Sequence, residues 1–159
     1  MIRVGLGQDS HRFEAEGSSK PLILGGVVFP GHPGLEANSD GDVVLHAIFN
    51  ALSQAIGKRS LGIYADPMCA QGITGSREYL KVALDMVRAA GYTVNNVGVS
   101  IEARRPKIEP RAEEMKTSLA RLLAVAEDQV GITATSGEGL TAFGRGEGIQ
   151  VFVIASLVR

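Results

Sequence analysis

The sequence predicts an α+β domain in which helices cover one face of a mixed β-sheet. Strand-like segments lie at both ends of the chain, and amphipathic helical segments lie mainly between them. Their order, β-β-α-α-β-α-β-β, lacks the regular alternation of a parallel α/β fold. The chain has 159 residues, enough to bury one core, so we expect a single domain spanning residues 1-159.

Two strand-like segments open the chain. The first covers residues 1–8, and a polar loop at 12–19 separates it from the second, at 21–30. The Gly25-Gly26 pair inside the second segment indicates a hairpin turn or a bulge. His32-Pro33-Gly34 has the composition of a turn, and we expect His32 to be a solvated loop residue.

Residues 40–56 have the periodicity of a helix that Ser39 or Asp40 can cap and Gly57 can end. Its apolar residues form one face. A second, polar stripe follows steps of three and four residues through Asp42, His46, Asn50 and Ser53. A lone helical histidine is usually solvated or a satisfied core residue, but this stripe also suits a histidine held as a ligand.

The segment 58–75 has no clean period and contains Asp66-Pro67. It predicts a long loop of the kind that forms a binding lid or a mobile segment. A second helix is expected from Ser76, as its cap, to about Ala90. The remaining expected elements are a strand at 93–103, a third helix at 110–125, and strands at 129–135 and 148–158.

Composition excludes several classes of function. Sixteen Lys and Arg against seventeen Asp and Glu give a net charge of -1, which does not favour general binding to nucleic acids or to membrane surfaces. The single cysteine, Cys69, cannot form an intrachain disulfide, and we expect an incidental loop thiol. No targeting segment and no apolar run long enough to cross a bilayer is recognised, so a cytoplasmic location is the simplest expectation.

A possible metal site follows from Asp9 and His11. In a strand these two side chains project to the same face, because residues two apart share a face. His46, near the start of the first helix, would complete a set of three ligands if the helix packs against that strand. One carboxylate and two imidazoles with a position left open are typical of a catalytic zinc centre. The spacing of Asp9 and His11 alone is weak support.

Three polar segments have functional and structural interpretations that remain open. Residues 133–140 offer hydroxyls, amides and one carboxylate, which suit phosphate and Mg²⁺, but they also suit a polar hairpin loop. In 144–148, Arg145 can contact phosphate or simply pair with Glu147. The basic run at 104–107 is either a rim that attracts phosphate or a solvated turn.

Taken together, these motifs resemble the 2-C-methyl-D-erythritol 2,4-cyclodiphosphate synthase family over essentially the whole chain. The most specific parts are Asp9-Ser10-His11, the segment 39–43 with His46, residues 103–107, and residues 143–149. The resemblance implies a homotrimer, with sheets packed around a threefold axis and active sites between neighbouring subunits. It excludes neither a non-catalytic or substrate-altered metal-binding trimer nor a related phosphohydrolase.

The resemblance also implies roles for particular residues. Asp9, His11 and His46 would hold Zn²⁺, and Glu138 would hold a second ion, Mg²⁺ or Mn²⁺. Asn38 and Ser136 would lie nearest the reacting phosphates as catalytic candidates. The implied substrate-binding positions are Asp9, His11, Asn38, Ser39, Gly62, Ala103, Arg104, Arg105, Pro106, Lys107, Ile108, Glu109, Thr135, Ser136, Gly137, Glu138, Ala142 and Arg145.

The implied reaction is an intramolecular phosphoryl transfer in the non-mevalonate route to isoprenoids, classed as a phosphorus-oxygen lyase. The 2-phosphate of 4-diphosphocytidyl-2-C-methyl-D-erythritol 2-phosphate attacks the β-phosphorus, CMP leaves, and a cyclic diphosphate forms. Such chemistry needs positioning and charge neutralisation more than a protein nucleophile. The absence of an obvious nucleophilic serine or cysteine motif is consistent with it.

The chain departs from the family pattern on the substrate side. Asn38 stands where the family usually has His, and Asn50 where it has Asp, so we expect altered transition-state support and weaker outer support of the metal. Residues 63–75 keep little of the family's lid. Further departures are Ser60-Leu61-Gly62 for Asp-Ile-Gly, Ser136 for Thr, and Ala142 for an aromatic residue.

Overall fold

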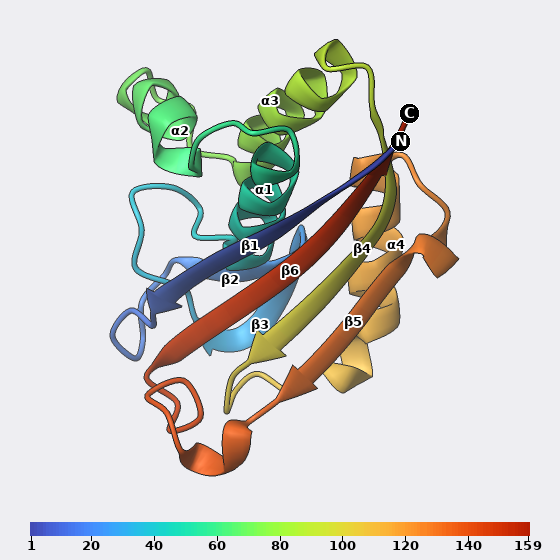
Figure 1. The fold of residues 1–159 in the computed structure, drawn as a ribbon. Coiled ribbons are helices and arrows are strands. Elements are labelled where there is room, and N and C mark those ends of the chain that lie inside the picture. Colours follow the sequence, from blue (N-terminus) through green and yellow to red (C-terminus); the bar gives the residue numbers. More distant parts are fainter.

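The computed structural model describes all 159 residues and contains a four-stranded sheet in the order β1-β6-β4-β5 (Figure 1). Its strands are β1 (Ile2–Arg12), β4 (Thr93–Glu102), β5 (Val130–Thr135) and β6 (Gly148–Val158). Strand β6 pairs antiparallel with both β1 and β4, whereas β4 pairs parallel with β5. The prediction of a mixed sheet is therefore confirmed.

The hairpin of β2 (Pro21–Leu24) and β3 (Val27–Pro33) forms a separate two-stranded sheet. Its turn is Gly25-Gly26, as predicted, and both glycines have positive φ, which favours residues without a Cβ. This hairpin packs beside the main sheet instead of joining it (Figure 1). His32 and Pro33 belong to β3, so the turn expected there is absent.

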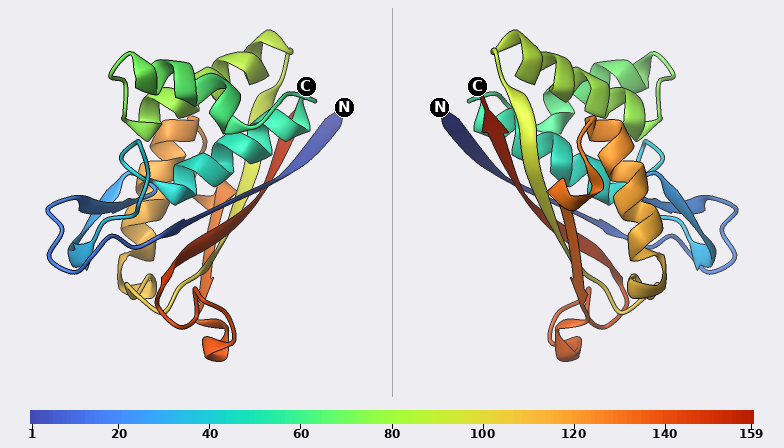
Figure 2. Two further views of the ribbon diagram at one scale, coloured as in Figure 1. Left: turned by 90° about the vertical axis from the view of Figure 1, so that its left-hand side faces the viewer. Right: turned by 90° about the vertical axis from the view of Figure 1, so that its right-hand side faces the viewer.

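Helices α1 (Val43–Ala55), α3 (Ser76–Ala89) and α4 (Ala112–Leu123) cover one face of the sheet (Figure 2). The apolar stripes predicted for them form the core, with Ile48, Leu80 and Leu119 each at most 1 % exposed. The caps differ from expectation. Asp42, rather than Ser39 or Asp40, caps α1, since its side chain accepts a hydrogen bond from Leu45 N. Ser76 is the first residue of α3 and does not cap it.

The prediction of a loop at 58–75 was wrong over much of its length, because this segment contains α2 (Leu61–Ala70). Only Ala65 of this helix is buried, so its sequence has no apolar stripe to reveal a helical period. Pro67 lies inside the helix, where proline is normally unfavourable. Figure 1 shows α2 at the periphery, against the other helices and away from the sheet.

Two glycines of β1 bring α1 directly onto this edge strand. A Cβ built on Gly5 would lie 2.0 Å from Ala51 O, and one on Gly7 would lie 1.9 Å from Ala47 O. Neither position tolerates a side chain, so the strand and the helix backbones are in contact. This close packing places the first turn of α1 beside the last residues of β1.

The opposite face of the sheet carries exposed apolar side chains. Val4 and Leu6 of β1 are 61 % and 51 % exposed, and Ile154 of β6 is 56 % exposed. Leu6 and Ile154 are direct partners in the β1–β6 ladder, so these side chains form one continuous patch. None of the helices is long and apolar enough to cross a membrane.

Candidate active site

Asp9, His11 and His46 converge where β1 meets the first turn of α1. Asp9 Oδ2 lies 2.9 Å from His11 Nε2 and 3.0 Å from His46 Nδ1. Alternation along β1 turns Asp9 and His11 to one face, and the Gly5 and Gly7 contacts bring α1 close enough for His46 to reach them. The structure thus assembles the three residues that the sequence singled out.

The charges of this cluster are mutually stabilising. Burial alone would raise the pKa of Asp9, but hydrogen bonds and charge interactions with His11 and His46 lower it to about 2. The hydrogen bond to Asp9 raises the pKa of His11 above 6.5. Asp9 is therefore an ionised acceptor, the form that a metal ligand must have.

The donor set fits a metal ion. One ligand atom from each of the three residues lies within 4.8 Å of the others. Asp9 Oδ2 is an acceptor only, so a positive charge, either a proton or a metal ion, must lie between it and His46 Nδ1. The side chains of Asp9 and His11 are 24 % and 22 % exposed and that of His46 only 6 %, so the cluster is open on one side. Three ligands with one open side are the arrangement of a catalytic centre.

A cavity of about 140 Å³ opens beside the cluster. The predicted substrate residues Asn38, Ser39 and Gly62 line it together with the three candidate ligands. Lys20 fixes the loop before Asn38, since its Nζ donates to Leu35 O at 2.8 Å and Ala37 O at 3.0 Å. Sequence reasoning missed other lining residues, namely Ala37, Leu61, Ala65, Asp66 and Tyr79.

The remaining predicted substrate residues form a second group at the ends of β4 and β5. Ala103 N donates to Thr135 O at 3.0 Å, and Arg104 N donates to Phe143 O at 3.1 Å, which ties the segments 103–109 and 135–145 together. Arg105 pairs with Glu16 at 2.6 Å and Arg145 with Glu147 at 3.4 Å. Glu138 has a φ of 56°, in the left-handed region, within the turn that follows β5.

Within one chain these two groups do not form a single site. β1 and β5 are the opposite edges of the sheet, with β6 and β4 between them. Three strand spacings separate the edges by about 14 Å. Ala142 is the exception, because it lines a cavity of about 210 Å³ together with Ser10 and His11.

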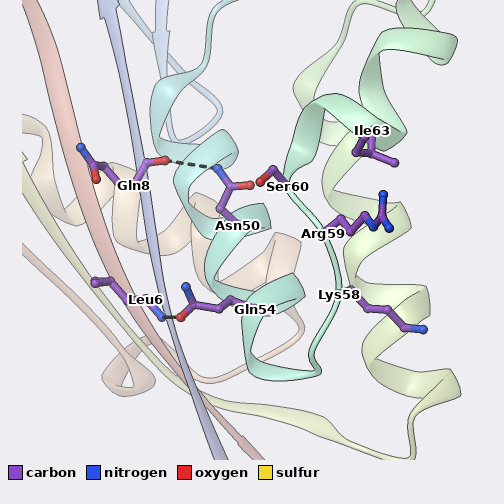
Figure 3. Close-up of a pocket in the computed structure, with 8 residues that line it drawn as sticks. All are labelled: Leu6, Gln8, Asn50, Gln54, Lys58, Arg59, Ser60 and Ile63. Atoms are coloured by element: carbon purple, nitrogen blue, oxygen red, sulfur yellow. Dashed lines mark hydrogen bonds between the residues drawn. The ribbon is translucent and has the colours of Figure 1, made fainter.

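The hydrogen bonds of Asn50 go to β1 and α2 and not to the metal cluster. Asn50 Nδ2 donates to Gln8 O at 3.2 Å (Figure 3). Its Oδ1 accepts from Leu61 N at 2.9 Å. Asn50 therefore links β1 to Leu61 at the start of α2, and Leu61 directly precedes Gly62. Gln8 and Asn50 line an open hollow of about 490 Å³, which Figure 3 shows between β1, α1 and the segment 58–60.

The fold and the three-ligand cluster are those of a candidate metalloenzyme, and comparison with known proteins is more specific. The chain belongs to the YgbB family, whose model matches residues 2–158. Among curated relatives, the 2-C-methyl-D-erythritol 2,4-cyclodiphosphate synthase of Chlamydia muridarum is 45% identical over 159 residues, 99% of this chain and 89% of that protein. The synthase of Chlamydia caviae is 47% identical over 158 residues, again 99% of this chain and 89% of that protein.

Solved structures agree with this relationship. The CDP complex of IspF from Plasmodium falciparum matches with a TM-score of 0.85 at 25% identity, covering 99% of this chain and 96% of that one. The bifunctional IspDF from Campylobacter jejuni matches with a TM-score of 0.89 at 34% identity, covering 99% of this chain and 42% of that one. The family resemblance and the α+β fold inferred from the sequence are both confirmed.

Proposed function

We propose that this chain catalyses the cyclisation of 4-diphosphocytidyl-2-C-methyl-D-erythritol 2-phosphate to 2-C-methyl-D-erythritol 2,4-cyclodiphosphate, with release of CMP. The reaction makes it a phosphorus-oxygen lyase of the non-mevalonate isoprenoid route, and its site of action is the cytoplasm. The observation that carries the proposal is the intact cluster of Asp9, His11 and His46 in a chain about 46% identical to curated synthases over nearly its whole length.

Asp9, His11 and His46 would hold Zn²⁺, and Glu138 a second ion, Mg²⁺ or Mn²⁺, bound with the substrate diphosphate. Oxygen and imidazole donors suit zinc, and a carboxylate beside phosphates suits magnesium. When bound, these ions supply Lewis acidity and neutralise phosphate charge. The buried His46 and the two half-buried ligands leave one side of the cluster free for an oxygen of the substrate.

The protein's own groups position the substrate. Asn38 and Ser39 line the cavity beside the cluster, where an amide and a hydroxyl can donate to phosphate oxygens. Gly62 lies on the other side of the same cavity, at the start of α2. Segment 103–109 would enclose the cytosine, and Thr135 and Ser136 would bind the phosphates. An in-line pose of the 2-phosphate against the β-phosphorus is the main requirement of the reaction.

A homotrimer would unite the two groups of site residues. The exposed apolar patch on the sheet supports self-association through that face, because a patch of this kind is normally covered in the functional assembly. Pairing the β1 edge of one subunit with the β5 edge of the next would bring Thr135 to Glu138 of one chain towards the metal cluster of its neighbour. The CDP bound in complexes of related enzymes supports a cytidine pocket in this chain.

The alternative suggested by the sequence, a metal-binding trimer without this catalysis, rests on Asn38 and the divergent 59-75 segment. The helix at Leu61–Ala70 weakens that argument, because it contributes Leu61, Gly62, Ala65 and Asp66 to the cavity. The curated relatives favour the synthase.

Two assays test the proposal. CMP release from the cytidine substrate should require divalent metal and should stop on chelation, and a metal-loaded protein that releases no CMP would refute it. Mixing tests the shared site: after subunit exchange, His46→Ala and Glu138→Ala proteins, each inactive alone, should regain activity, because some mixed sites are intact. If activity does not return although mixed trimers form, the site is not divided between subunits.

A further inference from the structure

Ser76 occupies a position that the capping of α3 does not explain. The helix begins at this residue, yet its N-cap is Gly75, which has no side-chain bond to the helix. Ser76 is instead 1 % exposed and points towards the metal cluster, with its Oγ 2.7 Å from His46 Nε2. His46 thus has the candidate metal position on its Nδ1 side and Ser76 on the other.

Asp40 determines how Ser76 is oriented. Asp40 Oδ1 accepts the Ser76 hydroxyl proton, and Asp40 Oδ2 accepts from Ser76 N at 3.0 Å. Asp40 itself is held by its backbone, since its N donates to Thr74 O at 2.9 Å. The backbone N–H of Ser76, the first of α3, is therefore satisfied by the carboxylate of Asp40. The Ser76 hydroxyl is not needed as a helix cap, and its oxygen can face His46.

The direction of these hydrogen bonds selects one tautomer of His46. A carboxylate can only accept, so the single hydroxyl proton of Ser76 goes to Asp40. The Ser76 oxygen can then interact favourably with His46 only by accepting a proton from Nε2. Ser39 Oγ is the other hydroxyl near Nε2, but at 3.5 Å it is at the limit of a hydrogen bond. His46 is thus an Nε2–H donor, and its Nδ1 would be free to direct a lone pair at a metal ion held between it and Asp9.

We propose that Ser76 and Asp40 are positioning residues for the metal site, fixing the ring orientation and the tautomer of His46. The inference rests on the proposed metal-binding role of His46. It is independent of the nature of the substrate. Hydrogen bonds from outer residues to a ligating histidine are a general way of fixing its tautomer and raising its basicity. Here the connection runs from a carboxylate through a serine hydroxyl, and its bonds are buried or partly buried.

The test measures Zn²⁺ affinity by competition with a chelator, without substrate, for wild type, Ser76→Ala and Asp40→Asn. Both variants should bind zinc about 10–100-fold more weakly. Ser53→Ala is the matched control, because Ser53 is also a 1 % exposed serine, on α1, and its hydroxyl donates to Arg59 O, away from the cluster. It should lose stability but keep its zinc affinity.

A second measurement reports the hydrogen bond between His46 and Ser76 directly. In zinc-loaded protein, NMR should show a His46 Nε2–H proton that exchanges slowly with water in wild type and faster in Ser76→Ala. Zinc affinity in Ser76→Ala within about twofold of wild type, or a His46 Nε2–H proton that exchanges equally fast in both proteins, would overturn the proposal. Failure of CMP release with normal zinc binding would contradict the cyclisation alone.

Discussion

His46 Nδ1 lies 3.0 Å from Asp9 Oδ2, although the two residues are 37 positions apart in the chain. This contact joins the edge strand of the sheet to the first turn of α1. It depends on the glycines at positions 5 and 7, which remove the side chains that would hold the helix away from the strand.

His46→Ala should abolish stoichiometric zinc binding. Outer-shell substitutions already weaken metal sites by about 10–100-fold, so loss of a ligand should exceed that range. Metal content by mass spectrometry of the purified protein measures it. His32→Ala is the control, because His32 lies in β3 and is not part of the cluster. Full zinc occupancy in His46→Ala would show that the site lies elsewhere.

In the metal-free protein, the cluster of Asp9, His11 and His46 should stabilise the fold by an amount that depends on pH. The pKa of Asp9 falls from 3.8 to about 2 on folding, so its stabilising effect is present above pH 3.8 and is lost as the pH drops towards 2. The pKa of His11 is raised above 6.5, so its effect is complete below pH 6.5 and is lost as the pH rises through the raised value. The contribution is therefore largest between pH 3.8 and pH 6.5.

Thermal unfolding of chelator-treated wild type and Asp9→Asn measures this contribution. The difference in Tm between the two proteins should be greatest near about pH 5 and smaller at about pH 3 and pH 8.5. A difference that does not change with pH would mean that the three side chains are not electrostatically coupled.

Asp42→Ala should destabilise the fold by more than about 2 kcal/mol, the combined cost of a lost helix cap and unsatisfied buried donors. Asp42 is fully buried and accepts from Leu45 N at 3.1 Å, Gly25 N at 2.9 Å and Gly26 N at 2.7 Å. It therefore holds both the start of α1 and the turn of the β2–β3 hairpin. Denaturant unfolding gives the free energy.

Ser60→Ala provides the comparison for that prediction. Ser60 is the N-cap residue of α2, but its side chain makes no capping hydrogen bond. Its replacement should change the free energy of unfolding by less than about 0.5 kcal/mol. Equal losses for the two variants would show that the bonds of Asp42 contribute nothing specific.

Asn50→Ala should loosen the start of α2. It removes both the bond to Gln8 O and the bond from Leu61 N, and it should cost about 1 kcal/mol because the site is partly exposed. Hydrogen exchange at the Leu61 amide should accelerate. Asn95→Ala, which removes an exposed bond to Ser156 Oγ, should leave that amide unchanged. Unaltered exchange at Leu61 in Asn50→Ala would contradict the bridging role.

Local patterns in the sequence predicted much of this structure. Alternation placed Asp9 and His11 on one face, and the Gly25-Gly26 pair marked the hairpin turn. The errors arose where a role depends on distant neighbours. Helix α2 buries only Ala65 and so has no periodic signal. Ser76 looked like a helix cap because its partners, Asp40 and His46, come from other segments. Asn50 likewise shares the stripe of His46 but points to β1 and α2.

The most direct test of the proposed cyclisation is ³¹P NMR of the products formed from 4-diphosphocytidyl-2-C-methyl-D-erythritol 2-phosphate by the zinc- and magnesium-loaded protein. We expect the signals of CMP and of a cyclic diphosphate to appear together, in equal amounts, and neither to appear with His46→Ala. CMP accompanied by an uncyclised product would indicate hydrolysis by water, and unchanged substrate signals with fully loaded protein would contradict the proposed catalysis.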